Sequence, residues 1–412
     1  MGFRVWPGMV AVMVLAGCSV PLPALTPAPS QSSLPNPSST PIQTVVAPVP
    51  TVPAPSPTVP AEPESTLTKA QKLVATMTPP QKAGQMILVE WTRKTGTTDE
   101  LTGLVEKYSA GGVLYLGPGW NIARTKVVSD KVAAITVVDG VRPFVAADQE
   151  GGEVQRLNGT GVTKIASANK QGSWSVEKLQ QSAGEWAQEL TQAGINLNLA
   201  PVADTVAAKQ AKKNQPIGAL KRQFGSDPSL VGEHAAAFIA GMSSNQVLTT
   251  LKHFPGLGRI SNNTDLSSKK IKDTVTTAND PYLEAFRLGI AAEPDMVMVS
   301  MAVYTQIDPK HQGVFSRIII EELLRDDLGW QGVVIADSMS AEAVAKTPAG
   351  QRAVDFIDAG GDLMSFGTIA DIKAAHKAIL TKMKSSEDFA ARVDQSVVRI
   401  ILAKNRVGLV DL

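Results

Sequence analysis

A lysine and a histidine stand side by side at the end of a short apolar run. Lys252 and His253 follow residues 247–251, and a Pro-Gly pair then turns the chain into a polar loop that reaches Asn263 and Asp265. An ammonium group, an imidazole and a carboxylate can together hydrogen-bond the hydroxyl groups of a polar ligand. Solvated charges at an ordinary strand end would have the same composition. The choice between these interpretations depends on residues elsewhere in the chain.

Carboxylates follow three other short apolar runs: Asp148, Asp204 and Asp337. A single acidic residue in such a place is usually a cap on the following helix. Capping is a weaker explanation when the ends of four runs all carry charged residues. Carboxylates, a lysine and a histidine that meet at one site can transfer protons and attack a carbon centre. These residues therefore predict a functional site, provided that the fold brings the four ends together.

The elements that must position these residues alternate along the chain. The short apolar runs are residues 84–89, 112–116, 143–147, 195–200, 247–253, 296–300, 332–336 and 361–366. Helical periodicity lies between them, at residues 176–193, 230–243, 281–292, 319–327 and 372–383. Eight such units predict an α/β fold, a (β/α)8 TIM-type barrel whose strands bring their C-terminal ends to one rim. An open doubly wound sheet is less consistent, because no glycine-rich phosphate loop follows the first run.

The N-terminal segment predicts export and attachment to a membrane. Arg4 precedes an apolar run, residues 9–16, that is too short to span a bilayer. The run ends in small residues before Cys18, the only cysteine in the sequence, and this pattern resembles a bacterial lipoprotein signal. We expect residues 1–17 to be a signal peptide and Cys18 to be lipidated. A plain secretory signal with an incidental cysteine is the alternative.

Composition divides the rest of the chain into a tether and a domain. Residues 18–66 are rich in Pro, Ser and Thr and predict a disordered linker, whereas residues 67–412 predict the barrel. The net charge of +1 gives no indication of nucleic-acid binding. We expect no metal and no cofactor, because the histidines lack metal-ligand spacing; they are His234, His253, His311 and His376. We also expect a monomer.

Three segments resemble the signatures of glycoside hydrolase family 3. They are residues 148–156 (DQEGGEVQR), 252–258 (KHFPGLG) and 332–340 (GVVIADSMS). The similarity runs from about residue 67 to the C-terminus and is greatest to the single-domain bacterial β-N-acetylglucosaminidases of cell-wall turnover. It implies a retaining glycosidase that releases terminal β-linked N-acetylglucosamine from peptidoglycan-derived glycans. With the lipoprotein signal, it implies a protein anchored in the bacterial envelope.

The resemblance also implies roles for individual residues. Asp337 matches the aspartate nucleophile, which would form a covalent glycosyl-aspartate. An aspartate suits this task, because a glycosyl ester is reactive enough to hydrolyse afterwards. The residues that match sugar-binding positions are Asp148, Arg156, Arg222, Lys252 and His253. Lys252 would in addition keep nearby aspartates ionised.

The loop after the Lys-His pair departs from the family pattern. The N-acetylglucosaminidase subgroup has an Asp-Ser-His triplet there, whereas this chain has Asn263, Thr264 and Asp265. We interpret Asp265 as the acid/base and Asn263 as the residue that orients it, through a hydrogen bond to its neutral carboxyl. Burial near Asp337 and Asp148 would raise the pKa of Asp265. A loop-capping aspartate in an enzyme whose acid lies elsewhere is the alternative.

Two other functions remain open at this point. One is a β-glucosidase or β-xylosidase of the same family, although most of its β-glucosidases carry a further C-terminal domain. The other is a non-catalytic, glycan-binding lipoprotein, although a pure binder has no need of a carboxylate in the position of Asp337.

Overall fold

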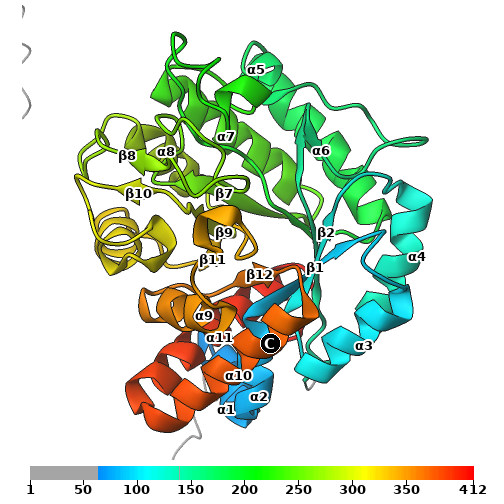
Figure 1. Ribbon diagram of the computed structural model, residues 1–412. Coiled ribbons are helices and arrows are strands. Elements are labelled where there is room, and N and C mark those ends of the chain that lie inside the picture. The colour runs from blue at the N-terminus through cyan, green and yellow to red at the C-terminus, as the bar shows by residue number, and fades with distance from the viewer. Residues whose placement is uncertain (1–63, 139) are drawn as a thin grey trace, which may run out of the picture. The chain divides into compact units, whose positions relative to one another are not determined.

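Eight parallel strands form a barrel at the centre of the domain (Figure 1). The computed structural model describes residues 64–138 and 140–412, so the predicted signal peptide, Cys18 and almost all of the predicted linker lie outside the described residues. Neighbouring strands pair in the order β11-β9-β7-β6-β3-β2-β1-β12, and a parallel bridge between Ile335 and Leu363 links the two ends. The (β/α)8 prediction is therefore confirmed.

Each predicted apolar run overlaps one barrel strand. The strands are β1 (Ile87–Thr92), β2 (Gly112–Leu116), β3 (Phe144–Ala147), β6 (Leu197–Asn198), β7 (Leu248–Phe254), β9 (Met296–Val299), β11 (Val333–Ala336) and β12 (Met364–Phe366). The remaining short strands pair outside the barrel, β4 (Gln149–Gly151) with β5 (Val154–Gln155) and β8 (Lys272–Asp273) with β10 (Val303–Tyr304).

Two of the predicted runs have the wrong boundaries. The first was expected to begin at Gly84, but Gly84 is part of helix α2 (Pro79–Gln85), which starts with a capping box and a proline in its first turn. The fourth run yields only the two residues of β6. Side-chain amides partly replace its backbone ladder, because Asn196 Oδ1 accepts from the Val145 N–H at 3.0 Å and Asn198 Oδ1 from the Gln149 N–H at 2.9 Å.

Helices surround the barrel, and the five predicted ones are present. They are α6 (Val176–Gln192), α7 (Pro228–Ser243), α8 (Leu283–Ala291), the π-helical η3 (Ile318–Asp327) and α10 (Ile369–Ser385). Sequence analysis missed α1 (Thr66–Thr76), α2, α3 (Thr98–Tyr108), α4 (Ile122–Ala133), the short α5 (Ala168–Gln171), α9 (Ala349–Asp358) and α11 (Glu387–Arg406). The starts of α6 and α7 follow local rules, since Ser175 and Asp227 cap them through side-chain oxygens.

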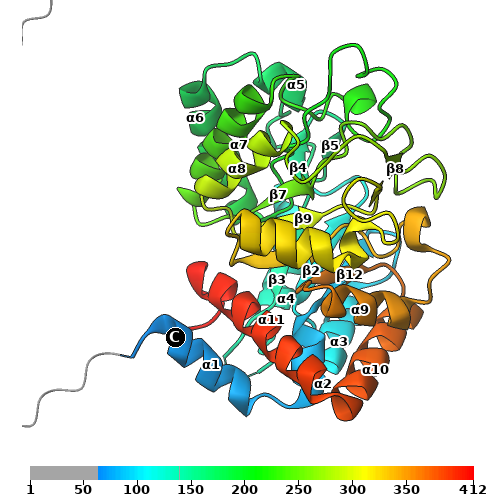
Figure 2. The same cartoon turned by 90° about the vertical axis from the view of Figure 1, so that its left-hand side faces the viewer.

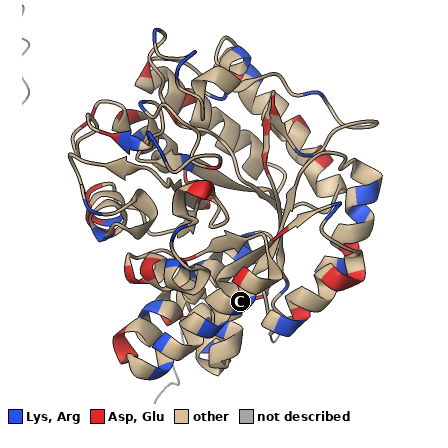
Figure 3. Ribbon diagram, viewed as in Figure 1, with Lys and Arg blue, Asp and Glu red and all other residues tan. Residues whose placement is uncertain are grey.

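The two ends of the described domain meet. Helices α1 and α11 pack side by side (Figure 2), and α11 also contacts α2. Basic and acidic segments are interspersed on the outer helices (Figure 3), in keeping with the small net charge. No helix within the described part of the chain is both long and apolar enough to cross a membrane.

Candidate active site

The charged strand ends meet in one pocket at the C-terminal rim of the barrel. The pocket has a volume of about 310 Å³. Its lining includes every residue for which sequence analysis suggested a catalytic or sugar-binding role: Asp148, Arg156, Arg222, Lys252, His253, Asn263, Asp265 and Asp337. Asp148 and Asp337 directly follow β3 and β11, and Lys252 and His253 lie near the end of β7. Three separate loops contribute the other residues, which are Arg156, Arg222 and the pair Asn263 and Asp265. The fold thus brings together side chains up to 189 positions apart in sequence, from Asp148 to Asp337.

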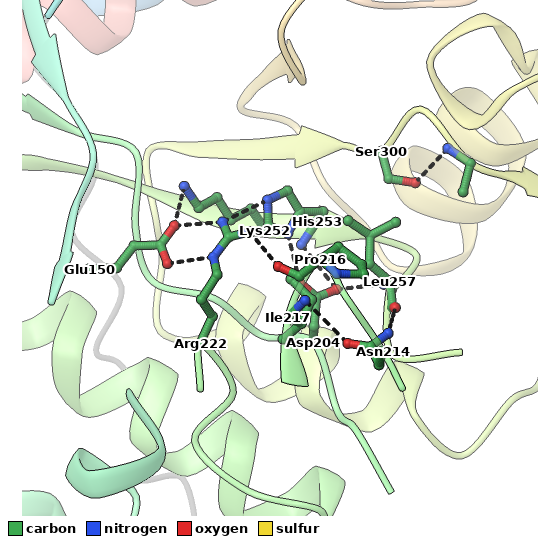
Figure 4. A network of polar contacts seen from close by, with 12 residues as sticks. Glu150, Asp204, Asn214, Pro216, Ile217, Arg222, Lys252, His253, Leu257 and Ser300 are labelled. Carbon is green, nitrogen blue, oxygen red and sulfur yellow. Dashed lines mark hydrogen bonds and ion pairs between the residues drawn. The ribbon is translucent and has the colours of Figure 1, made fainter. Parts of the chain in front are cut away.

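An ion-pair cluster forms one side of the site (Figure 4). Lys252 Nζ lies 2.9 Å from Asp148 Oδ1 and 2.7 Å from Glu150 Oε1. Arg222 donates to both oxygens of Glu150, from Nε at 2.9 Å and from Nη2 at 2.8 Å. Arg156 Nη2 lies 3.4 Å from Asp148 Oδ2. The bidentate contact fixes the plane of the Arg222 guanidinium.

The cluster keeps its carboxylates charged. Burial alone would raise the pKa of Asp148, but the charges of Lys252 and Arg156 outweigh this effect and hold that pKa below its usual range. Burial also acts to raise the pKa of Glu150, and Arg222 and Lys252 together lower it well below normal. In the same way the two carboxylates raise the pKa of Lys252 against the effect of its burial. The site therefore presents fixed charges to a ligand. Lys252 helps to keep Asp148 ionised, as we expected from the sequence.

His253 is held from both sides of its ring. Its Nδ1 lies 2.6 Å from Asp204 Oδ2, and its Nε2 lies 3.3 Å from Arg222 Nη2. A proton on Nδ1 satisfies both contacts. Asp204 is itself fixed, because its Oδ1 accepts from the Leu257 N–H at 2.6 Å. The Lys252–His253 peptide bond is cis, and both side chains line the pocket.

Asp337 lies directly after β11, and its carboxylate is oriented by its neighbour. Asp337 Oδ1 accepts from the Ser338 N–H at 2.9 Å, and the Asp337 N–H donates to Val299 O at 3.1 Å. The Ser338 hydroxyl in turn donates to Glu90 Oε1 at 2.7 Å. Ser365 donates to the same oxygen of Glu90, also at 2.7 Å.

The loop that carries Asp265 is docked on the segment that follows Asp337. Backbone N–H groups of Glu342 and Ala343 donate to the carbonyl oxygens of Asp265 and Thr264, at 3.2 and 3.1 Å. Asn263 Oδ1 accepts from the Asp265 N–H at 2.9 Å. This contact positions the backbone of Asp265, whereas we expected a contact with its carboxyl.

The surroundings of Asp265 favour its protonated form. The residue lines the pocket and stays exposed to solvent. Removal of water from around its carboxyl, followed by repulsion from Asp337, raises the pKa of Asp265 to about 6, against the opposing charges of Arg222 and His253. Because the residue is exposed, solvent screens part of the electrostatic effect. A carboxyl group that titrates near neutrality can serve as an acid in one step and as a base in the next.

Within residues 64–138 and 140–412, no three side chains of His, Cys, Asp or Glu are grouped so that they could hold a metal ion. The histidines other than His253 make separate contacts: His234 with Leu230 O and Trp174 O, His311 with Asp308, and His376 with Pro80 O.

The model of the glycosyl hydrolase family 3 N-terminal domain matches residues 78–403 of this sequence. The chain belongs to glycosyl hydrolase family 3. A beta-hexosaminidase from Stenotrophomonas maltophilia (strain K279a) is 32% identical over 278 residues, which are 65% of this chain and 79% of the relative. These matches confirm the family resemblance and show that the protein is a glycosidase.

Solved structures of family 3 glycosidases have the same fold. A crystal structure of the β-N-acetylhexosaminidase from Beutenbergia cavernae DSM 12333 has a TM-score of 0.77 and 40% sequence identity, with coverage of 80% of this chain and 99% of that chain. A family 3 β-N-acetylglucosaminidase from Paenibacillus sp. str. FPU-7 has a TM-score of 0.71 and 27% identity, with coverage of 82% of this chain and 65% of that chain.

Sequence analysis gave no role to three acidic residues of this family 3 site. Glu150 completes the ion-pair cluster, Asp204 holds His253, and Glu90 holds Ser338. Glu150 could have been found, since residues two apart on an extended segment point to the same side and Asp148 was already a candidate. Asp204 had been noted only as a strand-end residue. Glu90 directly follows the first predicted run and could have been found by the rule that gave Asp148 and Asp337, but it was not considered.

Proposed function

We propose that this glycosidase is a retaining β-N-acetylhexosaminidase that releases terminal, non-reducing β-linked N-acetylglucosamine from peptidoglycan-derived glycans. Its 40% identity to the Beutenbergia cavernae β-N-acetylhexosaminidase, over 99% of that chain, supports the sugar specificity. The pocket volume of about 310 Å³ is small for a ligand site and suits one terminal sugar ring. The observation that carries the mechanism is that Asp265 and Asp337 line the same pocket and interact electrostatically.

In the first step, an oxygen of the Asp337 carboxylate attacks the anomeric carbon. A carbon–oxygen bond to Asp337 forms as the glycosidic bond breaks, and the proton of Asp265 passes to the departing oxygen. The raised pKa of Asp265, about 6, keeps a useful fraction of this group protonated near neutrality. An aspartate with the reference pKa of about 3.9 would have almost none.

In the second step, water hydrolyses the glycosyl ester. Asp265, now ionised, accepts a proton from water, the water oxygen bonds to the anomeric carbon, and the Asp337 carboxylate departs. While Asp337 is esterified its negative charge is absent, so one of the causes that raise the pKa of Asp265 is removed. The pKa of Asp265 is therefore lower in the second step, so the group is ionised and available to accept a proton. Two displacements at one carbon retain its configuration.

The ion-pair cluster would hold the sugar ring during both steps. Lys252 and the two arginines present N–H groups to hydroxyl or carbonyl oxygens, and Asp148 accepts from hydroxyl groups. Because the cluster is already paired, it binds the sugar without large movements of charge.

We further propose that the protein acts as a monomer in the bacterial envelope, anchored through a lipid on Cys18. The N-terminal signal pattern and the composition of residues 18–66 support this location.

A panel of aryl β-glycosides tests the proposed specificity. We expect the purified protein to hydrolyse the β-N-acetylglucosaminide with a kcat/KM at least 100-fold above those for the β-glucoside and the β-xyloside, since a site built to bond the acetamido group loses paired contacts without it (roughly 10²-fold or more). Preference for either of the other sugars would contradict the proposal.

A further inference from the structure

Glu90 is a buried acid in the pocket that the proposed mechanism does not use. It lies in β1, is 7% exposed and lines the same cavity as Asp337. Its Oε1 accepts from the hydroxyl groups of Ser338 and Ser365, each at 2.7 Å. Glu90 thus connects the first strand of the barrel with the turn after β11 and with β12.

The contact with Ser338 leads directly to the nucleophilic carboxylate. The Ser338 N–H donates to Asp337 Oδ1 at 2.9 Å, while the Ser338 hydroxyl donates to Glu90 and accepts from the Ser340 N–H at 3.2 Å. The Ser340 hydroxyl accepts from the Gly367 N–H at 2.8 Å. The turn at residues 338–340 is therefore held by Glu90 on one side and by Gly367 on the other.

The same turn leads into the support of the acid/base loop. Glu342 and Ala343, which come next in the chain, donate to the backbone oxygens of Asp265 and Thr264. A shift of the turn would accordingly disturb both reacting carboxylates.

The surroundings of Glu90 disfavour its charged form. Burial raises the pKa of Glu90, the hydroxyl groups of Ser338 and Ser365 oppose that shift, and Asp148 adds to it. A buried carboxyl group costs free energy compared with an apolar side chain of the same size unless it is well paired. A glutamate at this position is better explained by its orienting of Ser338 than by a contribution to the stability of the fold.

We propose that Glu90 is a positioning residue, which accepts the Ser338 hydroxyl so that the Ser338 N–H stays directed at Asp337 and holds its carboxylate in line for attack. The inference rests on the proposed nucleophilic role of Asp337. An acceptor oxygen at this position is what matters, and the negative charge is not required.

The test compares Glu90→Ala with Glu90→Gln, using an aryl β-N-acetylglucosaminide as substrate. Glu90→Ala should lower kcat about 10- to 100-fold, because small misplacement of a reacting group costs up to that much. KM should change less than about 3-fold, because the sugar-binding residues are untouched. Glu90→Gln should retain most of kcat and the wild-type pH profile, since its amide oxygen can accept the same two hydroxyl groups.

Two further variants separate positioning from stability. Ser338→Ala should reproduce the loss of Glu90→Ala, and the double variant should be no slower than the slower single one, because the two residues act in series. Asp295→Ala is the matched control. Asp295 is also a buried carboxylate with a raised pKa, mainly from burial, and accepts from Thr249, but it precedes β9 at the opposite end of the barrel. It should lower the thermal midpoint without a comparable loss of kcat.

Three results would overturn the inference: an unimpaired kcat in Glu90→Ala, equal losses in the Ala and Gln variants, or an equal loss in Asp295→Ala. Asp337→Ala, assayed in parallel, distinguishes this failure from that of the proposed function. If Asp337→Ala is inactive while Glu90→Ala is unimpaired, only the positioning role is wrong. If a well-folded Asp337→Ala stays active, the nucleophile itself is misassigned.

Discussion

The two carboxylates that we propose to react differ in what surrounds them. Asp337 is oriented by the Ser338 N–H at 2.9 Å, and Ser338 is in turn held by Glu90. Asp265 lies on a loop at the pocket and has a pKa raised to about 6 by removal of water from around its carboxyl group and by Asp337. A carboxyl group with a raised pKa beside a second carboxylate is typical of a general acid in a retaining glycosidase. The assignment of Asp265 therefore depends on its place beside Asp337 as well as on the resemblance of its loop to the family pattern.

Replacement of Asp265 should affect substrates according to their leaving groups. Asp265→Ala should slow a substrate with a poor leaving group about 10²- to 10⁴-fold, because its departing oxygen needs a proton. An activated aryl glycoside needs little protonation and should be slowed far less in its first step. Azide should partly restore turnover of the activated substrate, since it needs no general base. Equal slowing of both substrates, with no effect of azide, would show that the acid lies elsewhere.

The same group predicts the dependence of activity on pH. Asp265 must be protonated for the first step and loses its proton as the pH rises through about 6, so kcat/KM for a poor leaving group should fall above that pH. The fall should be about tenfold per pH unit well above the pKa. In Asp265→Ala the decline near this pH should disappear, and a decline that persists unchanged would assign it to another group.

At the scale of elements, the loops and strand ends divide the work. Asp148 follows β3, Glu150 lies in β4 and Lys252 in β7, and loops supply Arg156 and Arg222 to the ion-pair cluster. The proposed nucleophile, Asp337, follows β11, and the loop with the proposed acid/base is docked on the segment after it. Apolar runs predicted all eight strands, because parallel strands buried on both faces are apolar throughout. Charged residues at their ends then predicted the pocket. Glu90 follows the first predicted run and was open to the same argument, whereas the partners of Glu150 and Asp204 depend on contacts between segments far apart in sequence.

Two buried lysines with different partners should contribute differently to the free energy of unfolding. Lys252 is 2% exposed and pairs with Asp148 and Glu150, whereas Lys404 is 0% exposed and its Nζ donates to the neutral Gln85 Oε1 at 2.7 Å. Burial lowers the pKa of Lys404 to about 7. Lys252→Met should lower the free energy of unfolding by about 3 kcal/mol or more, because it leaves buried carboxylates with one cation fewer.

Lys404→Met should leave the free energy of unfolding unchanged or raise it, since it replaces a poorly solvated amine by an apolar side chain. Urea denaturation of both variants at neutral pH measures the difference. Similar losses in the two variants would contradict the view that Lys252 is stabilised by its ion pairs.

At the scale of the whole molecule, we expect the domain and the N-terminal segment to have separable tasks. α1 begins at Thr66 with Ser65 as its cap, and it packs against α11. A protein truncated to start at Ser65 should therefore fold and keep its kcat and KM on soluble aryl glycosides. In the full-length protein, Cys18→Ala should move the enzyme from the membrane fraction to the soluble fraction with no loss of activity. Continued membrane association of that variant would exclude the lipid anchor on Cys18.

The stereochemistry of the reaction tests the central claim most directly. Proton NMR can follow the anomeric signal of the first sugar released from an aryl β-N-acetylglucosaminide, before mutarotation mixes the anomers. Two successive displacements, at Asp337 and then by water, predict that β-N-acetylglucosamine appears first and the α anomer later. If the α anomer appears first, the reaction inverts, and Asp337 does not form a glycosyl-enzyme.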